Sequence, residues 1–308
     1  MTLSEADQIM SNEMISILPE NELQRMGINF DDLSLIRDKD GVSVWRVKTG
    51  RDSFVLKCFG KREHRREITN YQILNSLGIP TLKVIAHTDR AILLEDIETS
   101  CYRFGTDKDL SDPKAAVLIA EWYKKLHENG RKYASSHQLY DECDNITLDN
   151  ITKIIDKTGT GELSVWQTVL RKFDVIKNAV MKLPRTLTYN DFYYTNLAVA
   201  REGTSALMYD YNLLGKGYIY SDIRNVCSSL SDEAKVAFLS SYGSFNVNEI
   251  IIDDVISVLF DLIVACEQDT FPSWANDSLE VLRDGRFLSA VEKLLETETG
   301  GKTSIKDM

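Results

Sequence analysis

The pattern of apolar and polar residues between positions 42 and 59 contains two strand-like runs. Val42–Lys48 and Ser53–Phe59 are rich in β-branched and aromatic side chains, which are enriched in strands. Thr49-Gly50-Arg51-Asp52 separates the two runs, and a turn that contains glycine between such runs indicates a β-hairpin. Two further strands are expected over Leu82–Ala86 and Ala91–Glu95.

A helix is expected between the two pairs of strands. Glu67, Tyr71 and Leu74 recur at the spacing that places side chains on one face of a helix. This charged helix begins near Lys61. Gly78-Ile79-Pro80 is expected to end it, because glycine favours the position after a helix and proline cannot continue one.

The pattern becomes helical after Ile97. Ser111-Asp112-Pro113 provides a capping residue and then proline at the first helical position, and we expect Gly130 to end the helix that starts there. Two further helical stretches cover roughly residues 146–157 and 163–182. The remainder of the chain is therefore expected to be mainly helical.

This change of pattern predicts an α+β fold with two lobes and a boundary near residue 97. Residues 1–97 would form the smaller lobe around an antiparallel sheet, with an amphipathic helical lead-in over residues 1 to about 30. Residues 98–308 would form the larger, helical lobe and end in a frayed tail. A chain of 308 residues is long enough to bury one large core or two moderate ones.

Composition limits the kinds of molecule that this protein is expected to bind and the compartment where it is expected to act. The net charge of −11 argues against nucleic acid, whose binding depends on lysine and arginine neutralising phosphates. The five scattered cysteines form no CxxC pair, which is typical of reduced thiols in a cytoplasmic protein. The N-terminus shows no signal peptide, and the most apolar segment, Ile250–Cys266, is too short and too charged to span a membrane.

Asp191, Asn196 and Asp210 form the most informative group of polar residues. Asp191 and Asn196 have the D-x-x-x-x-N spacing of a kinase catalytic loop, and Asp210 follows a short hydrophobic run. Phosphoryl transfer to a hydroxyl needs a carboxylate beside the nucleophile and oxygen ligands for Mg²⁺. We assign Asp191 as the base or orienting group, and Asn196 and Asp210 to Mg²⁺. Taken alone, the spacing is also consistent with a polar turn.

Lys57 lies within the apolar strand Ser53–Phe59, where a cation costs free energy unless it is paired. Glu67 on the following helix is the expected partner, and Glu63 is the alternative. In a kinase such a pair holds the lysine against the α- and β-phosphates of the nucleotide. The alternative for Lys57 itself is a lysine at the strand edge that extends into water.

Leu93-Leu94-Glu95-Asp96-Ile97 ends the last strand of the smaller lobe at the lobe boundary. Backbone groups there could bind the edge of an adenine ring, with apolar residues covering its faces. Glu95 and Ile97 are therefore candidate nucleotide contacts. The alternative is an ordinary strand end.

Taken together, these residues resemble the aminoglycoside phosphotransferase and choline kinase family, small-molecule kinases with a protein-kinase-like fold. The resemblance runs from about Leu35 to Asp222. The family's His-Gly-Asp-Leu-x-x-x-Asn loop is matched by Tyr189-Asn190-Asp191-Phe192, with Asn196 in register. Its metal-binding motif is matched by Met208-Tyr209-Asp210-Tyr211, and the aspartate that commonly braces the catalytic loop is matched by Asp222.

Two positions depart from the family pattern. Tyr189 replaces the loop histidine, whose packing and hydrogen bonding a tyrosine can take over. The segment Asp38-Lys39-Asp40-Gly41-Val42-Ser43 lacks a full G-x-G-x-x-G, although the family often lacks it too. Gly41 and Ser43 remain candidates for phosphate contact. Leu126-His127 matches a Leu-His pair in a core helix of the family, where a structural role is expected.

The resemblance implies transfer of the γ-phosphate of ATP to a hydroxyl of a small molecule, with Mg²⁺. Residues 1–97 would then bind the nucleotide, and residues 98–308 would carry catalysis and the substrate site. GTP in place of ATP, the acceptor and the oligomeric state stay open. The alternative function is a nucleotide-binding pseudokinase or scaffold, whose signature would be loss of Lys57, Asp191 or Asp210; all three are present. A kinase acting on protein is disfavoured, because only a short loop separates Asp210 from Asp222.

Asp254 and Asp261 fall at i and i+7 in the apolar segment Ile250–Cys266, and therefore on one face of a helix. If that face borders the cleft, it could bind a cationic substrate, as acidic C-terminal helices bind aminoglycosides in the family. The alternative is a solvated stripe on a core helix. We count Asp222, Asp254 and Asp261 as candidate substrate contacts.

Overall fold

The computed structural model describes residues 18–300, and their fold is α+β, as the sequence predicts. Contacts divide the chain into two compact units. The described part of unit 1 comprises residues 18–130, 189–214 and 225–243, and that of unit 2 comprises residues 131–188, 215–224 and 244–300. Most of the expected helical lead-in lies outside the described residues, and so does the tail from residue 301. The lobe boundary near residue 97 stays a prediction.

An antiparallel sheet of five strands in the order β1-β2-β3-β5-β4 dominates the first part of unit 1. Its strands are β1 (Asp32–Lys39), β2 (Val42–Thr49), β3 (Asp52–Phe59), β4 (Val84–His87) and β5 (Ala91–Glu95). Helix α2 (Pro19–Arg25) precedes the sheet. The hairpin and the two later strands that the sequence predicts are thus confirmed.

A two-residue turn joins β1 to β2. Lys39 pairs with Val42, and the intervening Asp40 and Gly41 have φ angles of +55° and +83°. Positive φ at both central residues is the geometry of a type I′ turn, which Asp-Gly favours because glycine has no Cβ. The segment expected as a nucleotide loop is therefore a tight hairpin.

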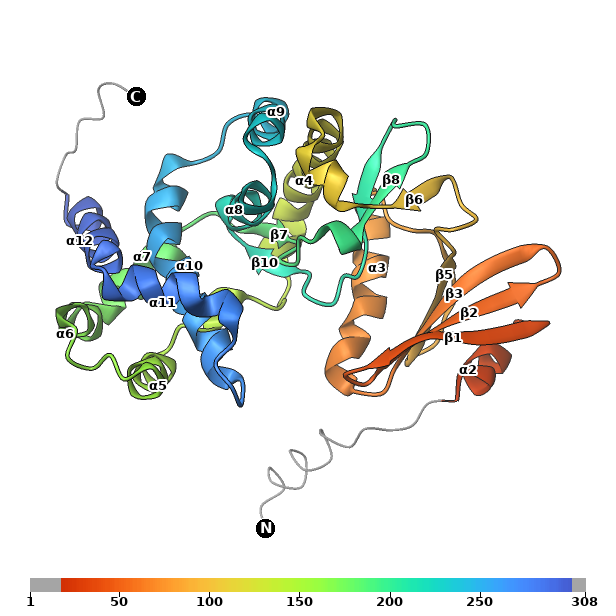
Figure 1. Ribbon diagram of the computed structural model, residues 1–308, viewed down its shortest axis with the longest axis horizontal. Helices are drawn as coiled ribbons and strands as arrows, with labels where there is room; N and C mark the ends of the chain where they lie inside the picture. Colours follow the sequence, from red (N-terminus) through yellow and green to blue (C-terminus); the bar gives the residue numbers. More distant parts are fainter. Residues whose placement is uncertain (1–17, 301–308) are drawn as a thin grey trace, which may run out of the picture. The chain divides into compact units, whose positions relative to one another are not determined.

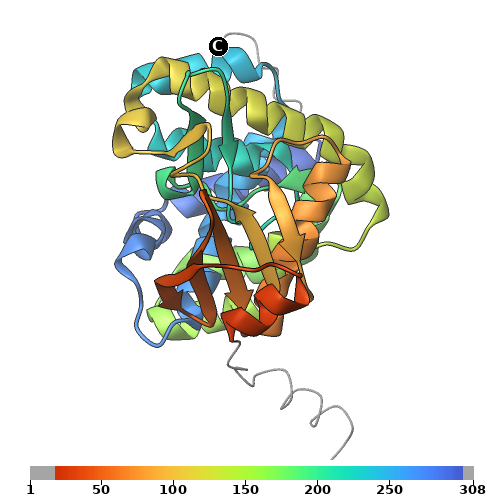
Figure 2. The same cartoon turned by 90° about the vertical axis from the view of Figure 1, so that its right-hand side faces the viewer.

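Helix α3 (Arg66–Ser76) lies beside the sheet in both views (Figures 1 and 2). A 3₁₀ turn, η1 (Arg62–Arg65), precedes it, and Gly78 with φ +67° follows it, as the glycine signal predicts. Its buried side chains include Glu67, Tyr71 and Leu74, the three residues that the helical spacing singles out.

The other elements of unit 1 position the segment from Tyr189 to Leu214. A second sheet has the order β6-β8-β9. Its strands are β6 (Tyr102–Phe104), β8 (Leu197–Ala200) and β9 (Ala206–Met208). The remaining elements are η2 (Asp107–Ser111), α4 (Pro113–Ser136), η4 (Tyr194–Asn196), α8 (Ile219–Ser229) and α9 (Asp232–Tyr242), of which α4 and α8 each run from one unit into the other.

One expected helix end is wrong, and one expected helical stretch contains two helices. Helix α4 does not stop at Gly130 but continues to Ser136. Leu126, Gly130 and Ala134 follow one another at i, i+4 and i+8 and are all buried, so packing along this face outweighs the cost of about 1 kcal/mol for a glycine inside a helix. The stretch 163–182 is two helices, α6 (Ser164–Arg171) and α7 (Phe173–Met181), because Lys172 leaves the helical conformation.

An aromatic cluster forms part of the core of unit 1. Trp122 of α4 contacts Tyr123 and the rings of Tyr189 and Tyr211 in the segment that follows β7. Tyr71 of α3 meets Tyr211 edge to face, with the ring centroids 4.7 Å apart. The cluster fixes the two ends of the 189–211 segment against α3 and α4, so its backbone is anchored by large rigid side chains.

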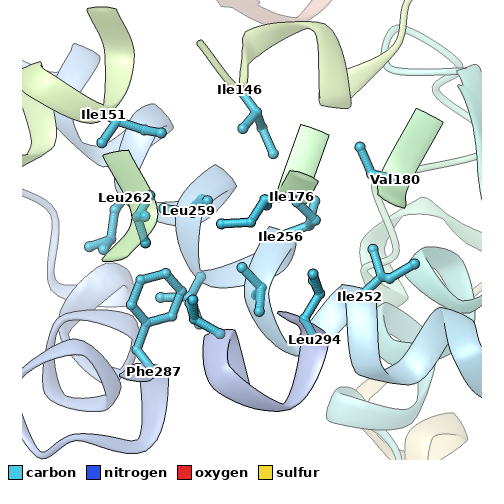
Figure 3. Packing of buried hydrophobic residues seen from close by; sticks show 14 of the residues in the cluster. Ile146, Ile151, Ile176, Val180, Ile252, Ile256, Leu259, Leu262, Phe287 and Leu294 are labelled. Carbon is cyan, nitrogen blue, oxygen red and sulfur yellow. The ribbon is translucent and has the colours of Figure 1, made fainter. Parts of the chain in front are cut away.

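Unit 2 is helical around a hydrophobic core. Its elements are η3 (Glu142–Asn145), α5 (Leu148–Thr158), α6, α7, β7 (Thr186–Thr188), β10 (Gly215–Gly217), α10 (Val247–Glu267), η5 (Ser273–Ala275), α11 (Asn276–Arg283) and α12 (Arg286–Glu298). Ile256, Leu259 and Leu262 of α10 pack in this core with Phe287 of α12 (Figure 3). No helix within residues 18–300 is long and apolar enough to cross a membrane.

Replacing Tyr189 by phenylalanine should lower the free energy of unfolding by about 1–3 kcal/mol, because it leaves a partly buried carbonyl without its donor. The Tyr189 hydroxyl donates to the carbonyl oxygen of Tyr209 at 2.5 Å, and burial raises the pKa of Tyr189 well above its usual range, which keeps the donor protonated. Urea unfolding followed by circular dichroism measures the effect. Tyr193, whose exposed fraction is 62%, is the matched control, and Tyr193→Phe should leave the midpoint unchanged. Equal stability of both variants would contradict the role given to Tyr189.

Candidate active site

Lys57 and Glu67 form a buried ion pair. In β3 the side chains of Leu56 and Cys58 enter the hydrophobic cluster behind the sheet, so alternation directs Lys57 to the opposite face. The Lys57 Nζ atom lies 2.7 Å from Oε1 and 2.8 Å from Oε2 of Glu67. Glu63, the alternative partner, is exposed and faces His64 instead. The structure thus brings together the pair that the sequence favours.

Asp210 is the second carboxylate on Lys57, with Oδ1 3.2 Å from Nζ. Burial favours the neutral amine of Lys57, but the charges of Glu67 and Asp210 outweigh it, and the pKa of Lys57 is raised. Lys57 is therefore a fixed cation at neutral pH. Asp210 is the most exposed of the three side chains, so its carboxylate also remains accessible.

Asp191 and Asn196 contact each other directly. The Asn196 amide nitrogen donates to Asp191 Oδ2 at 3.0 Å and to the Asp191 backbone oxygen at 3.2 Å. This leaves the side-chain oxygen of Asn196 available to a cation. Burial, followed by the charge of Asp210, raises the pKa of Asp191 to about 6, although the hydrogen bond from Asn196 and the charge of Lys57 oppose the shift.

Two non-glycine residues of this segment adopt the left-handed backbone conformation. Asn190 has φ +65° and Asp210 has φ +66°. Such angles cost about 1–3 kcal/mol each and persist only when the surroundings impose them. The Asn190 amide nitrogen donates to the Leu213 carbonyl at 3.0 Å, and asparagine tolerates this conformation better than most residues. Asn190 precedes the candidate base Asp191, and Asp210 is itself a candidate metal ligand, so both strained positions belong to the candidate site, a feature that the sequence does not display.

Five of the candidate residues, but not Asp191, line a cavity of about 460 Å³ within unit 1. Lys57, Asn196, Asp210, Glu95 and Ile97 all contribute to its wall. Glu95 at the end of β5 also accepts a hydrogen bond from the backbone of Lys83 at 2.7 Å. A smaller cavity of about 230 Å³ shares Lys57 and Asp210 with the first and is also lined by Glu67.

Gly41 and Ser43 contribute to neither cavity wall. A Cβ atom on Gly41 would lie 2.9 Å from Cγ of Lys61, so the glycine packs against that side chain. The Ser43 hydroxyl accepts a hydrogen bond from Trp45 Nε1 at 3.0 Å. Their roles in phosphate contact stay predictions.

A magnesium ion fits the donor set of this site. Within residues 18–300 no group of three or more His, Cys, Asp and Glu residues could hold a metal ion. Mg²⁺ is usually held by one or two protein oxygen ligands together with substrate phosphates and waters, so Asp210 and the side-chain oxygen of Asn196 would suffice. Two carboxylates facing one lysine also leave negative charge for a cation to balance.

Sequence reasoning misses a polar network at the end of β5. Asp96 is buried, with 1% of its surface exposed, and accepts hydrogen bonds from Arg46 Nε at 2.9 Å and Ser53 Oγ at 2.6 Å. Arg46 also pairs with Glu98 at 2.8 Å, and all three charged residues line the larger cavity. Asp96 stands inside the strand-end motif of the sequence, but no local pattern identifies Arg46, fifty positions earlier, as its partner.

The candidate substrate residues lie in unit 2. Asp222 of α8 is fully buried, Asp254 of α10 is exposed, and Asp261 of α10 accepts a hydrogen bond from Ser278 at 2.8 Å. The two helix carboxylates therefore differ in burial despite their spacing of seven, and the exposed fraction of Asp254 agrees with a solvated position. The substrate roles of all three residues stay predictions.

Two further acidic residues of unit 2, Asp253 and Glu142, have buried environments that the sequence does not reveal. Asp253 is buried and accepts hydrogen bonds from Tyr218 Oη at 2.7 Å and Arg224 Nε at 2.8 Å. Burial raises the pKa of Glu142 to about 8, and the charge of Asp222 and, more weakly, that of Asp261 add to the shift against the opposing charge of Arg224. Glu142 belongs to η3, far from α8 and α10 in sequence, so only the fold gathers these carboxylates.

No family model and no curated protein matches this chain. Solved structures do match it over nearly its whole length. The choline kinase of Streptococcus pneumoniae is 15% identical with a TM-score of 0.58, covering 95% of this chain and 99% of that chain. An aminoglycoside phosphotransferase from Alicyclobacillus acidocaldarius is 11% identical with a TM-score of 0.56, covering 94% and 98%. A spectinomycin phosphotransferase in complex with ADP and spectinomycin is 13% identical with a TM-score of 0.50, covering 91% and 99%.

At this level of identity the similarity concerns the fold. The expected fold class is confirmed: the chain has the protein-kinase-like fold that choline kinases and aminoglycoside phosphotransferases share.

Proposed function

We propose that this protein is an ATP-dependent phosphotransferase that moves the γ-phosphate to a hydroxyl of a small molecule. One observation carries the proposal: Lys57 lies between Glu67 and Asp210, while Asp191 is bound to Asn196, and all five residues belong to unit 1. These are the residue types that phosphoryl transfer uses for positioning and charge stabilisation. The fold shared with small-molecule kinases supports the same reaction class.

Each residue has a defined part in the proposed reaction. Lys57, held by Glu67, positions the phosphates of the nucleotide. Asp191 orients the acceptor hydroxyl and takes its proton as the oxygen attacks the γ-phosphorus and the bond to the ADP oxygen breaks. Asn196 holds Asp191 through its amide nitrogen and, with Asp210, offers oxygen ligands to Mg²⁺. When bound, Mg²⁺ neutralises charge that develops on the phosphate oxygens.

An amine-bearing acceptor is the substrate class that we favour. Burial, followed by the charges of Asp222 and, more weakly, Asp261, raises the pKa of Glu142 to about 8 even though the charge of Arg224 opposes the shift. A cationic group would relieve this repulsion. The structural neighbours include kinases named for choline and for spectinomycin, both of which carry nitrogen cations. Mg²⁺-dependent ADP release over aminoglycosides, choline, homoserine and hydroxylated sugars tests the acceptor class.

Asp191→Asn should reduce turnover by about 10²- to 10⁴-fold, the range that a positioned general base contributes. The asparagine keeps the shape of the side chain and an oxygen that accepts from Asn196, so the fold should persist. Substrate-stimulated ADP release measures the effect, with Asp107→Asn at an exposed position of η2 as the control. Full activity of Asp191→Asn would exclude Asp191 as the base.

The pH dependence of the wild-type protein follows from the pKa of Asp191, which is raised to about 6. Only the carboxylate accepts a proton, so kcat/KM should fall as the pH drops below about 6.

Because the folded state holds the Asp191 proton more tightly than the unfolded chain does, ionised Asp191 destabilises the fold above that pH. Asp191→Asn should therefore melt at the same temperature as wild type or higher at pH 8, with the difference vanishing towards pH 4. A lower melting temperature at pH 8 would contradict this assignment.

Asp210→Ala should abolish Mg²⁺-dependent turnover while leaving the fold largely intact. The variant removes a proposed metal ligand, but Lys57 keeps its partner Glu67. ADP release measured against Mg²⁺ concentration, together with circular dichroism, separates loss of the metal site from loss of structure. Unchanged turnover would overturn the metal assignment.

A further inference from the structure

Strand β1 changes its facing halfway along. Leu33 is opposite Val47 and Leu35 is opposite Trp45, but the next paired residue, Arg37, is opposite Val44. Ile36 is therefore an extra residue, which makes a β-bulge. Since directly opposite residues share a face of the sheet, the bulge reverses which positions of β1 face each side.

The reversal directs two cations to the cavity side of the sheet. Before the bulge, Leu33 packs with Val47 and Trp45 in the hydrophobic cluster behind the sheet. After it, Arg37 and Lys39 share the face of Val44 and Val42, and all four line the smaller cavity with Lys57 and Asp210. Without the extra residue, odd-numbered positions would continue to face the cluster. Arg37 also lines the larger cavity, so it stands where the two cavities adjoin.

The smaller cavity holds charged and polar groups that the described residues do not fully satisfy. Lys57 is bound by Glu67, and Lys39 has Asp40 at 3.6 Å, but Arg37 makes no ion pair within residues 18–300. The His64 Nδ1 and Asn212 Oδ1 atoms are buried on this cavity and have no hydrogen-bond partner among the described residues. Buried polar atoms without partners mark places where a ligand completes the hydrogen bonding.

The hairpin above this cavity does not supply a glycine-rich phosphate loop. Its turn contains only Asp40 and Gly41, and Gly41 packs closely on the stem of Lys61. Ser43 is opposite Asp38 and uses its hydroxyl on Trp45. A phosphate in this cavity would therefore meet the side chains of β1 rather than a run of loop amides, and arginine binds phosphate oxygens through paired donors.

We propose that Arg37, turned to the cavity by the bulge at Ile36, binds the phosphates of the nucleotide in place of glycine-rich loop amides. The inference rests on the proposed function, since it names a nucleotide contact of the same site. Lys39 lies two residues further along the same face, where its positive charge would help to balance the negative charge of the phosphates. His64 offers a ring nitrogen at the same cavity.

Isothermal titration of Arg37→Ala with Mg²⁺·ATP, Mg²⁺·ADP and adenosine tests the inference. A charge-assisted hydrogen bond contributes about 1.5–3 kcal/mol, so ATP and ADP should bind about 10- to 100-fold more weakly, while adenosine binds as in wild type. The matched control is Arg51→Ala, since Arg51 is an exposed arginine of the next hairpin turn and lines neither cavity. It should leave all three affinities unchanged.

A double variant separates direct contact from a general charge effect. Arg37→Ala/Asp38→Arg places a cation one residue later, on the face of the sheet opposite the cavity. Affinity for ATP should stay low if Arg37 acts by contact, and recovery would overturn the proposal. Wild-type ATP affinity in Arg37→Ala, or an equal loss for adenosine, would overturn it while leaving the proposed function standing. Failure of wild type to bind any nucleotide would overturn both.

Discussion

The burial of Lys57 between two carboxylates is the interaction on which unit 1 depends. A buried ammonium is costly unless charged partners replace water, and Glu67 and Asp210 do so from different elements. The pair with Glu67 ties β3 to α3, and the contact with Asp210 ties both to the segment after β9. Because one cation faces two anions, the arrangement holds surplus negative charge where a divalent ion would be bound. The contacts that hold β3, α3 and the segment after β9 together at Lys57 therefore also provide the charge that the proposed metal site needs.

Helix α3 holds this arrangement at a second point. Three residues after Glu67, the Asn70 amide nitrogen donates to the backbone oxygen of Tyr211 at 2.7 Å. One face of α3 thus positions Lys57 through Glu67 and fixes the backbone beside the strained Asp210. The hydroxyl of Tyr189, the residue before Asn190, binds the carbonyl of Tyr209 and secures the other end of the same segment. These contacts supply the support that two left-handed non-glycine residues require.

Sequence reasoning identifies what local patterns encode. Runs rich in β-branched and aromatic residues give the strands β2 and β3, and helical spacing gives α3. Glu67 on that helix is the expected partner of Lys57 and also the observed one. Chain order and spacing also single out Asp191, Asn196 and Asp210; the last two line the larger cavity, and Asp191 is bound to Asn196. The predictions that fail and the contacts that are missed depend on packing between residues distant in sequence. Gly130 continues a helix because its face is buried, and Arg46 of β2 pairs across β3 with Asp96 at the end of β5. Glu142 acquires its charged surroundings only when α8 and α10 are in place.

The pairing register of β1 with β2 is the clearest example of structural information that the residue composition does not contain. The segment around Gly41 lacks a glycine-rich motif, and from the sequence alone this absence suggests that no phosphate-binding loop is present. In the structure, one extra residue at Ile36 changes the face of every residue that follows it in β1. Under strict alternation Arg37 and Lys39 would face the hydrophobic cluster behind the sheet, but the bulge turns them to the cavity. The chemistry available at this site is therefore set as much by where a strand is interrupted as by which residues it contains.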